Sequence, residues 1–261
     1  MPELTQPHII AHRGASLLAP ENTLAAFDLA IQQGADGCEC DVRLTADGTL
    51  IVLHDELVDA TTDGHGPIGN YTADAARQLQ VRQRGGIFVA NEHLPLLTEV
   101  LTRLTPPQVS SNFILNVEIK QTGSGVLAAA VADELHQHQV EQFVLISSFD
   151  EVALRHLQQH YPHIRLALLY PPTLTASMVS GITRSTAFVR KAAALGCVAV
   201  HPMWRLVTPS LVTEAHALGL QVNVWTVDDP LQARRLATFG VDGIITNDPA
   251  GLRATFTSAT A

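Results

Sequence analysis

The chain has 261 residues, of which 46% are hydrophobic and 16% are charged, and its formal net charge is −9. This composition provides enough apolar surface for a core and excludes a disordered chain, while the acidic balance argues against a nucleic-acid partner, which needs a basic surface. No apolar run approaches the roughly 18 residues that span a bilayer, and the first residues lack the basic and apolar regions of a secretion signal, so we expect a cytoplasmic protein without stable membrane insertion.

In chain order, short runs rich in β-branched residues alternate with stretches of helical periodicity. The predicted strands cover residues 8–12, 37–44, 113–119, 143–148, 165–170, 197–201, 221–225 and 243–247. The predicted helices cover residues 24–31, 98–104, 125–139, 150–160, 186–195, 211–218, 229–239 and 249–255. Eight strands that each precede a helix predict an α/β fold of the (β/α)8 TIM barrel type rather than a doubly wound sheet.

Two segments are too long for ordinary barrel connections. Residues 45 to about 97 follow the second strand and begin with "TADGTLIVLHD", which predicts a hairpin around Asp47 and Gly48. Residues 170–188 predict a second long loop, after the fifth strand. Because neither segment is a Pro-rich or charged linker, we expect one barrel domain over residues 1–261 with a small insertion at about 45–97.

The three cysteines are Cys38, Cys40 and Cys197. Their odd number argues against a disulfide framework, and no second cluster of cysteine or histidine accompanies them to suggest zinc. Free cysteine is among the most buried residue types, so we expect all three in the core.

Charged residues alternate with apolar ones along the second and third predicted strands. Since successive side chains of a strand point to opposite faces, the apolar set faces the helices and the polar set faces the barrel interior. The polar sets are Glu39, Asp41 and Arg43 on one strand, and Asn116, Glu118 and Lys120 on the other.

Three carboxylates at the ends of adjacent strands require a cation. A hard divalent ion such as Mg²⁺ or Ca²⁺ prefers oxygen ligands, which predicts a metal site at Glu39, Asp41 and Glu118. The alternative is a salt-bridge network inside the barrel, in which Arg43 and Lys120 neutralise the acids.

Two histidines are predicted at the same rim. His12 ends the first strand and is followed by Arg13, while His54 ends the apolar run of "LIVLHD". Either histidine alone is typical of a surface or core position, but together with the acids they indicate substitution at phosphorus, with one imidazole as base and the other as acid. Trp225 faces inward on the seventh strand as a substrate wall or as a barrel plug, and His201 is a weaker candidate that a core position also explains.

Six segments of the sequence resemble the glycerophosphodiester phosphodiesterase family across nearly the whole chain: "AHRGASLLAPENTLAAF", "GCECDVRLTADGTLIVLHD", "TTDGHGPIGNYT", "LPLLTEVL", "NVEIK" and "VNVWTVDD…GVDGIITNDP". The resemblance implies metal-dependent hydrolysis of a small-molecule glycerophosphodiester to glycerol 3-phosphate and an alcohol. It implies the following roles: His12 and His54 as the acid/base pair, Glu39, Asp41 and Glu118 as ligands of Mg²⁺ or Ca²⁺, Arg13 and Lys120 as phosphate ligands, and Trp225 as a wall for the glycerol or leaving group.

Two smaller interpretations and two rival functions complete the sequence analysis. Glu21 and Asn22 of "PENT" either start a helix or order the loop after His12 by hydrogen bonding, and Asp228, where the family often has Asn, is interpreted as a helix N-cap. A rival function is phospholipase D-type action on sphingomyelin or lysophospholipids, although such relatives need an apolar lipid face that we do not find in the sequence. A non-catalytic barrel is the other rival, but it would be expected to have lost one of the two histidines or three acids.

Overall fold

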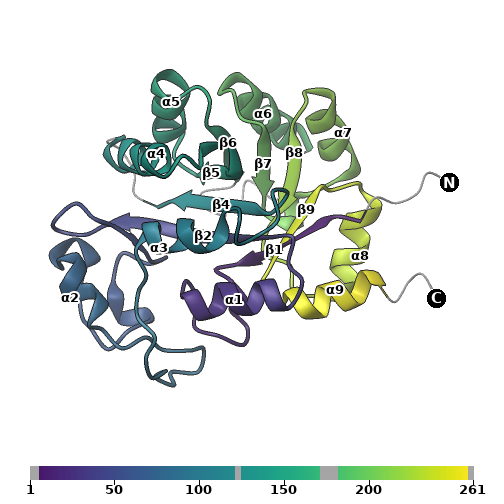
Figure 1. Cartoon of the computed structure of the whole chain (residues 1–261). Coiled ribbons are helices and arrows are strands. Elements are labelled where there is room, and N and C mark those ends of the chain that lie inside the picture. The colour runs from purple at the N-terminus through teal and green to yellow at the C-terminus, as the bar shows by residue number, and fades with distance from the viewer. Residues whose placement is uncertain (1–5, 121–124, 171–181, 258–261) are drawn as a thin grey trace.

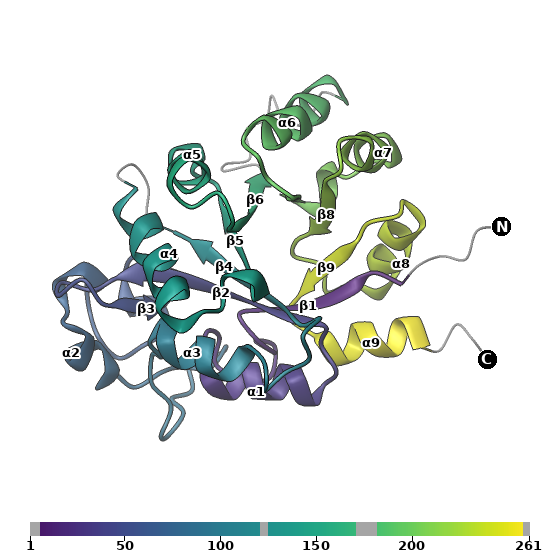
Figure 2. The same cartoon turned by 45° about the horizontal axis from the view of Figure 1, so that its top comes forward.

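The computed structural model describes residues 6–120, 125–170 and 182–257. Within these ranges eight parallel strands form a closed barrel, and Figures 1 and 2 show the helices packed around its outside. The barrel strands, in spatial order, are β1 (His8–His12), β2 (Gly37–Leu44), β4 (Ile114–Ile119), β5 (Val144–Ser148), β6 (Arg165–Tyr170), β7 (Ala199–Pro202), β8 (Gln221–Val224) and β9 (Gly243–Thr246). β1 pairs with both β2 and β9, which closes the sheet and confirms the predicted TIM barrel.

The connecting helices follow the strands in alternation. They are α1 (Leu24–Gln32), α3 (Leu97–Leu104), α4 (Val126–His138), α5 (Glu151–His160), α6 (Ile182–Ala194), α7 (Pro209–Ala217), α8 (Pro230–Thr238) and α9 (Pro249–Thr257). The long loop predicted over 170–188 is shorter than expected at its far end, because α6 already begins at Ile182, and residues 171–181 lie outside the described ranges. In the described part of the chain no helix combines the length and the apolar character needed to cross a bilayer.

The main core lies between the barrel strands and the helices. Phe27 of α1, Leu115 of β4 and Val222 of β8 are fully buried in this layer. Cys38 and Cys40 are buried in the same layer as free thiols, as predicted from the alternation along β2. The outward face of each strand is therefore used for packing, which leaves its inward face available for polar side chains.

The insertion is built on the predicted hairpin. β3 (Leu50–Val52) runs antiparallel to β2, with Val42 opposite Val52, and Gly48 takes a φ of 77° in the turn that joins them. The insertion buries a second apolar cluster, which includes Ile51, Leu53, Val58, Ile68 and Val81. It also contains a short α-helix that we did not predict, α2 (Ala73–Arg77), from which Arg77 forms an ion pair with Glu99 of α3. Two 3₁₀ helices, at Val58–Ala60 and Ile68–Asn70, were not predicted either.

Candidate active site

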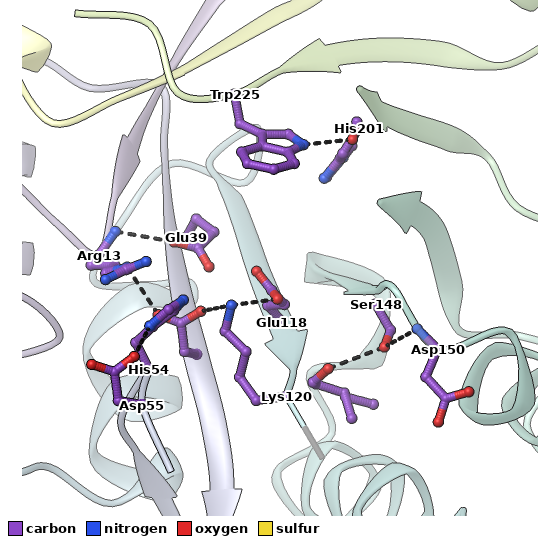
Figure 3. Close-up of polar contacts among 12 residues, drawn as sticks. Arg13, Glu39, His54, Asp55, Glu118, Lys120, Ser148, Asp150, His201 and Trp225 are labelled. Carbon is purple, nitrogen blue, oxygen red and sulfur yellow. Dashed lines mark hydrogen bonds and ion pairs between the residues drawn. The ribbon is translucent and has the colours of Figure 1, made fainter. Parts of the chain in front are cut away.

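A cavity of about 230 Å³ opens at the carboxyl ends of the barrel strands. Polar and apolar residues share its wall, and Figure 3 shows Arg13, Glu39, Glu118 and Lys120 close together where β1, β2 and β4 end. The lining residues are His12, Arg13, Glu39, His54, Asn116, Glu118, Lys120, Phe149, Leu169, Trp225, Thr226 and Ile245. This is the end of the barrel where TIM-barrel enzymes place their catalytic groups.

The three predicted acids lie close together, and two of them, Glu39 and Glu118, line the cavity. Glu39 and Asp41 share the inward face of β2, and the parallel register places Asp41 opposite Glu118 on β4. One carboxylate oxygen from each of the three lies within 4.8 Å of the others, and all three residues are buried. Strand alternation and register thus bring together the residues that we proposed as metal ligands.

Two cations compensate part of this negative charge. Lys120 Nζ lies 3.0 Å from Asp41 Oδ1 and 2.5 Å from Glu118 Oε1, and Arg13 Nε lies 3.2 Å from Asp41 Oδ2. The salt-bridge alternative was therefore correct for Lys120 but wrong for Arg43. The guanidinium of Arg43 instead donates two hydrogen bonds to the main-chain carbonyl of His54, at 2.9 and 2.7 Å.

The carboxylates differ sharply in their affinity for protons. Burial raises the pKa of Glu39 well above its usual range, and the neighbouring Asp41 and Glu118 add to the effect. Burial also raises the pKa of Glu118, to about 7, although Lys120 opposes this shift. For Asp41 the balance is reversed, because Lys120 and Arg13 outweigh the effect of burial and lower its pKa.

The ring of His12 is held by a chain of hydrogen bonds that begins at Asp228. The Nδ2 amide of Asn247 donates to Asp228 Oδ2 at 2.7 Å, and a carboxylate can only accept, so Asn247 Oδ1 is the atom that faces His12 Nδ1, at 2.9 Å. His12 Nδ1 therefore carries the proton, and Nε2, 4.0 Å from Glu39 Oε2, keeps its lone pair. Burial, helped by Arg13, lowers the pKa of His12 to about 3 and keeps the ring neutral.

This network corrects the interpretation of Asp228. The N-cap of α8 is Asp229, which accepts hydrogen bonds from the backbone of Leu231 and Gln232. Asp228 instead accepts from Thr246 and from both nitrogens of Asn247. The two adjacent aspartates have the same capping preference, and only the path of the chain after β8 decides which of them caps the helix.

His54 comes from the insertion and not from the barrel. Its Nδ1 lies 2.6 Å from Asp55 Oδ1, so this nitrogen donates to the carboxylate, as Figure 3 shows. The main-chain clamp from Arg43 ties the residue to β2. Burial lowers the pKa of His54, while Asp41 and Asp55 favour the charged ring.

The loop after His12 is fixed in an uncommon backbone conformation. Arg13 and Asn22 have positive φ angles of 57° and 59°, and the backbone nitrogen of Arg13 donates to Glu39 Oε2 at 3.1 Å. Asn22 binds the carboxylate of Asp41 at 2.8 Å, and Glu21 accepts from Arg13 at 2.6 Å. The helix-start interpretation is wrong, since Thr23 is the N-cap of α1, and the rim hydrogen-bond interpretation is confirmed.

The opposite wall of the cavity is apolar. Trp225 is half-buried and packs edge-on against Phe149, with ring centres 5.6 Å apart, so it lines the cavity and does not plug the barrel. Its Nε1 donates to the main-chain oxygen of His201 at 2.6 Å. The His201 side chain is fully buried beside Asn223 and lies outside the cavity lining, as the core interpretation predicted.

Sequence reasoning missed several residues that contribute to the site, among them Asn247 and Phe149. Asn247 directly follows β9 and Phe149 directly follows β5, and these are the positions that face the cavity in a TIM barrel. Their position at the end of a strand was a usable signal, but we did not apply it to the strands that precede these two residues.

The whole chain, including the residues of this site, is similar to known proteins. A model of the glycerophosphoryl diester phosphodiesterase family matches residues 12–251. The glycerophosphodiester phosphodiesterase of Caldanaerobacter subterraneus subsp. tengcongensis is 36% identical over 246 residues, which cover 92% of this chain and 94% of that protein.

Solved structures agree with this sequence relationship. The glycerophosphodiester phosphodiesterase of Agrobacterium tumefaciens is 29% identical, with a TM-score of 0.76 over 95% of this chain and 100% of the other. A phosphodiesterase of Oleispira antarctica, solved in complex with the product sn-glycerol-3-phosphate, is 27% identical, with a TM-score of 0.80 and 97% coverage of both chains.

Proposed function

Since the chain belongs to the glycerophosphoryl diester phosphodiesterase family and is an enzyme of that class, we propose that it hydrolyses glycerophosphodiesters by two-histidine acid/base catalysis beside a bound divalent cation. The products are glycerol 3-phosphate and an alcohol. One observation supports this proposal above all: His12 and His54 line the same cavity as Arg13 and Lys120, together with two of the three converging carboxylates.

The acid cluster fits a hard divalent cation such as Mg²⁺ or Ca²⁺. Its donors are all carboxylate oxygens, and Glu39 Oε1 is buried without a hydrogen-bond partner among the described residues. Glu39, Asp41 and Glu118 would hold the ion. When bound, it supplies positive charge for the non-bridging oxygens of the phosphodiester.

Arg13 and Lys120 are the groups that we assign to phosphate binding. Both line the cavity, and both are already oriented by the acids, Arg13 by Glu21 and Asp41 and Lys120 by Asp41 and Glu118. Donors held in this way need little rearrangement as negative charge grows on the phosphorus oxygens.

His12 is suited to be the general base. Its neutral ring has a proton on Nδ1, held by Asn247, and a free lone pair on Nε2. This lone pair takes the proton from the attacking hydroxyl, which belongs either to water or to the neighbouring glycerol. The charge that develops on the ring is then stabilised by Glu39 and Asp41.

His54 is suited to be the general acid. Asp55 orients its ring and favours the charged form, and a bound phosphodiester anion adds to this effect. In the charged ring Nε2 also carries a proton, which is delivered to the oxygen of the departing alcohol. We regard the barrel and the insertion as one catalytic domain, because the insertion supplies this histidine to a cavity of the barrel.

The test compares two leaving groups. Hydrolysis of glycerophosphoethanolamine expels ethanolamine through its hydroxyl oxygen, which is a poor leaving group and needs a proton from an acid. Hydrolysis of the p-nitrophenyl ester of glycerol 3-phosphate expels p-nitrophenolate, which leaves without protonation. His54→Ala should lose about 10²–10⁴-fold in kcat on the first substrate and little on the second, while His12→Ala should lose activity on both. EDTA should abolish turnover, and Mg²⁺ or Ca²⁺ should restore it.

The matched control is His65→Ala, because His65 lies in the same insertion but is exposed and outside the cavity. It should behave as the unmodified enzyme. Full activity of both active-site alanine variants would refute the histidine assignment. Equal losses of His54→Ala on the two substrates would refute its role as the acid.

A further inference from the structure

Four large apolar side chains are exposed on two adjacent loops at the rim of the barrel. Leu17 and Leu18 belong to the loop between β1 and α1, while Ile87 and Phe88 belong to the connection between α2 and α3. Leu18 is 58% exposed and Ile87 is 68% exposed. The side-chain amide of Gln83 donates to the carbonyl of Leu18 at 2.7 Å, which joins the two loops. We call these four residues, with Arg82 and Arg84, the rim patch.

The second loop is a narrow hairpin. Arg82 pairs with Phe88, the backbone nitrogen of Gln83 donates to Ile87, and two glycines with positive φ form the turn. Figures 1 and 2 both show the connection between α2 and α3 projecting beyond the body of the molecule. Ile87 and Phe88 therefore lie at a protruding tip, where a core residue would be out of place.

The same tip carries positive charge on a protein whose net charge is −9. The guanidinium of Arg82 lies 4.7 Å above the ring of Phe88, and Arg84 is exposed. Among the described residues no carboxylate lies within 4.0 Å of either guanidinium. The rim patch thus combines apolar side chains with arginines whose charge is not compensated.

The rim patch is also connected to the cavity. The backbone nitrogen of Leu17 donates to the carbonyl of Asn247 at 3.0 Å, and the side chain of Asn247 holds the ring of His12. A surface bound to the rim patch would therefore lie beside the mouth of the site.

We propose that the rim patch docks the enzyme on an anionic lipid bilayer. Leu17, Leu18, Ile87 and Phe88 enter the headgroup region, and Arg82 and Arg84 bind lipid phosphates, which is the combination that holds proteins at membrane interfaces. A protein partner fits less well, because a standard interface uses about 20–30 residues on each side and this patch offers six. This exposed apolar face corrects our expectation from the sequence that the chain has none. The inference goes beyond the proposed reaction and does not depend on it.

The experiment is co-sedimentation of the full chain with phosphatidylglycerol/phosphatidylcholine vesicles and with phosphatidylcholine vesicles alone. We expect binding to the anionic vesicles that weakens as salt is added. The double variant Leu18→Ser/Ile87→Ser should bind about tenfold more weakly or worse, and Arg84→Gln about fivefold more weakly.

Two control variants match these changes elsewhere on the surface. Leu231→Ser removes a leucine of α8 that is 73% exposed, and Arg155→Gln removes an exposed arginine of α5. Both should bind vesicles as the unmodified chain does. Every variant should hydrolyse soluble glycerophosphoethanolamine at the unmodified rate, so that failure of docking and failure of the proposed function give different results.

Three results would overturn the proposal: no binding to anionic vesicles, equal binding to both vesicle types, or equal losses in the control variants. Size-exclusion chromatography in the absence of lipid provides a further check. A dimer that Leu18→Ser/Ile87→Ser dissociates would show that the patch contacts a second copy of the chain instead.

Discussion

The position of His12 depends on one amide, and the variant Asn247→Ala removes it. Asn247 Oδ1 accepts from His12 Nδ1 at 2.9 Å and from the Ser16 hydroxyl at 2.8 Å. The carboxylate of Asp228 keeps its bonds to Thr246 and to the backbone nitrogen of residue 247, so the fold of this loop should survive. What is lost is the acceptor that fixes the tautomer and the orientation of the catalytic ring.

The size of the effect follows from that lost acceptor. Leaving the Nδ1 proton of a buried ring without a partner costs about 1–3 kcal/mol. If that cost falls on the transition state, kcat decreases roughly 5- to 150-fold. The KM should change little, because Arg13 and Lys120 and not His12 are the proposed phosphate ligands.

The assay measures release of glycerol 3-phosphate from glycerophosphoethanolamine at saturating cation, with thermal unfolding recorded on the same preparations. Ser16→Ala is the matched control, since it removes the other donor to the same Asn247 oxygen and leaves the bond to His12 intact. It should stay within about twofold of the unmodified kcat. An unchanged kcat in Asn247→Ala, or an equal loss in Ser16→Ala, would refute the positioning role.

Three further predictions concern the cation, a buried histidine and a glycine. A divalent cation at about a hundred times its Kd should raise the free energy of unfolding by about 2.7 kcal/mol, and Glu39→Gln should remove this gain. A thermal unfolding midpoint that does not rise when the cation is added would argue against the metal site. Burial lowers the pKa of His201 to about 3, so below pH 6.5 the unfolded chain binds a proton that the folded chain does not. The protein should lose about 2 kcal/mol through this group by about pH 5, and denaturant titrations of His201→Gln should show a correspondingly smaller loss. Gly14→Ala should destabilise the fold by about 2 kcal/mol more than Gly48→Ala. Both glycines have positive φ, but a Cβ at Gly14 would lie 2.5 Å from the backbone of Ala26, whereas a Cβ at Gly48 would contact nothing within 4 Å. Equal denaturation midpoints of the two variants would contradict this prediction.

The fold was accessible from the sequence because each step used only local periodicity. Alternation of apolar and charged residues on β2 fixed which side chains face the barrel interior, and Glu118 followed from the same rule on β4. Parallel register then brought the two strands together at Asp41 and Glu118, with no further information needed.

The hydrogen-bond network around His12 was not accessible in that way. His12 and Asn247 are 235 positions apart, and their contact depends on the barrel closing between β1 and β9 with a particular register. The roles of Asp228 and Asp229 likewise depend on the path of one loop and not on residue type. Ile87 and Phe88 have the composition of core residues, and only the structure shows that they lie at a hairpin tip.

The two interpretations of the acid cluster, a salt-bridge network and a metal site, become compatible once the charges are counted. When all three carboxylates are ionised, Lys120 and Arg13 balance two of their charges and leave one, and a phosphodiester in the cavity brings a second negative charge. A divalent cation beside the three carboxylates would balance these two charges, whereas the other group in the described cavity lining that can become positive, His54, has a proton to deliver to the leaving group. Lys120 also lines the cavity, so it can exchange a carboxylate oxygen for a phosphate oxygen only when another cation takes its place beside Asp41 and Glu118. On this argument, substrate and cation should each bind more tightly when the other is present.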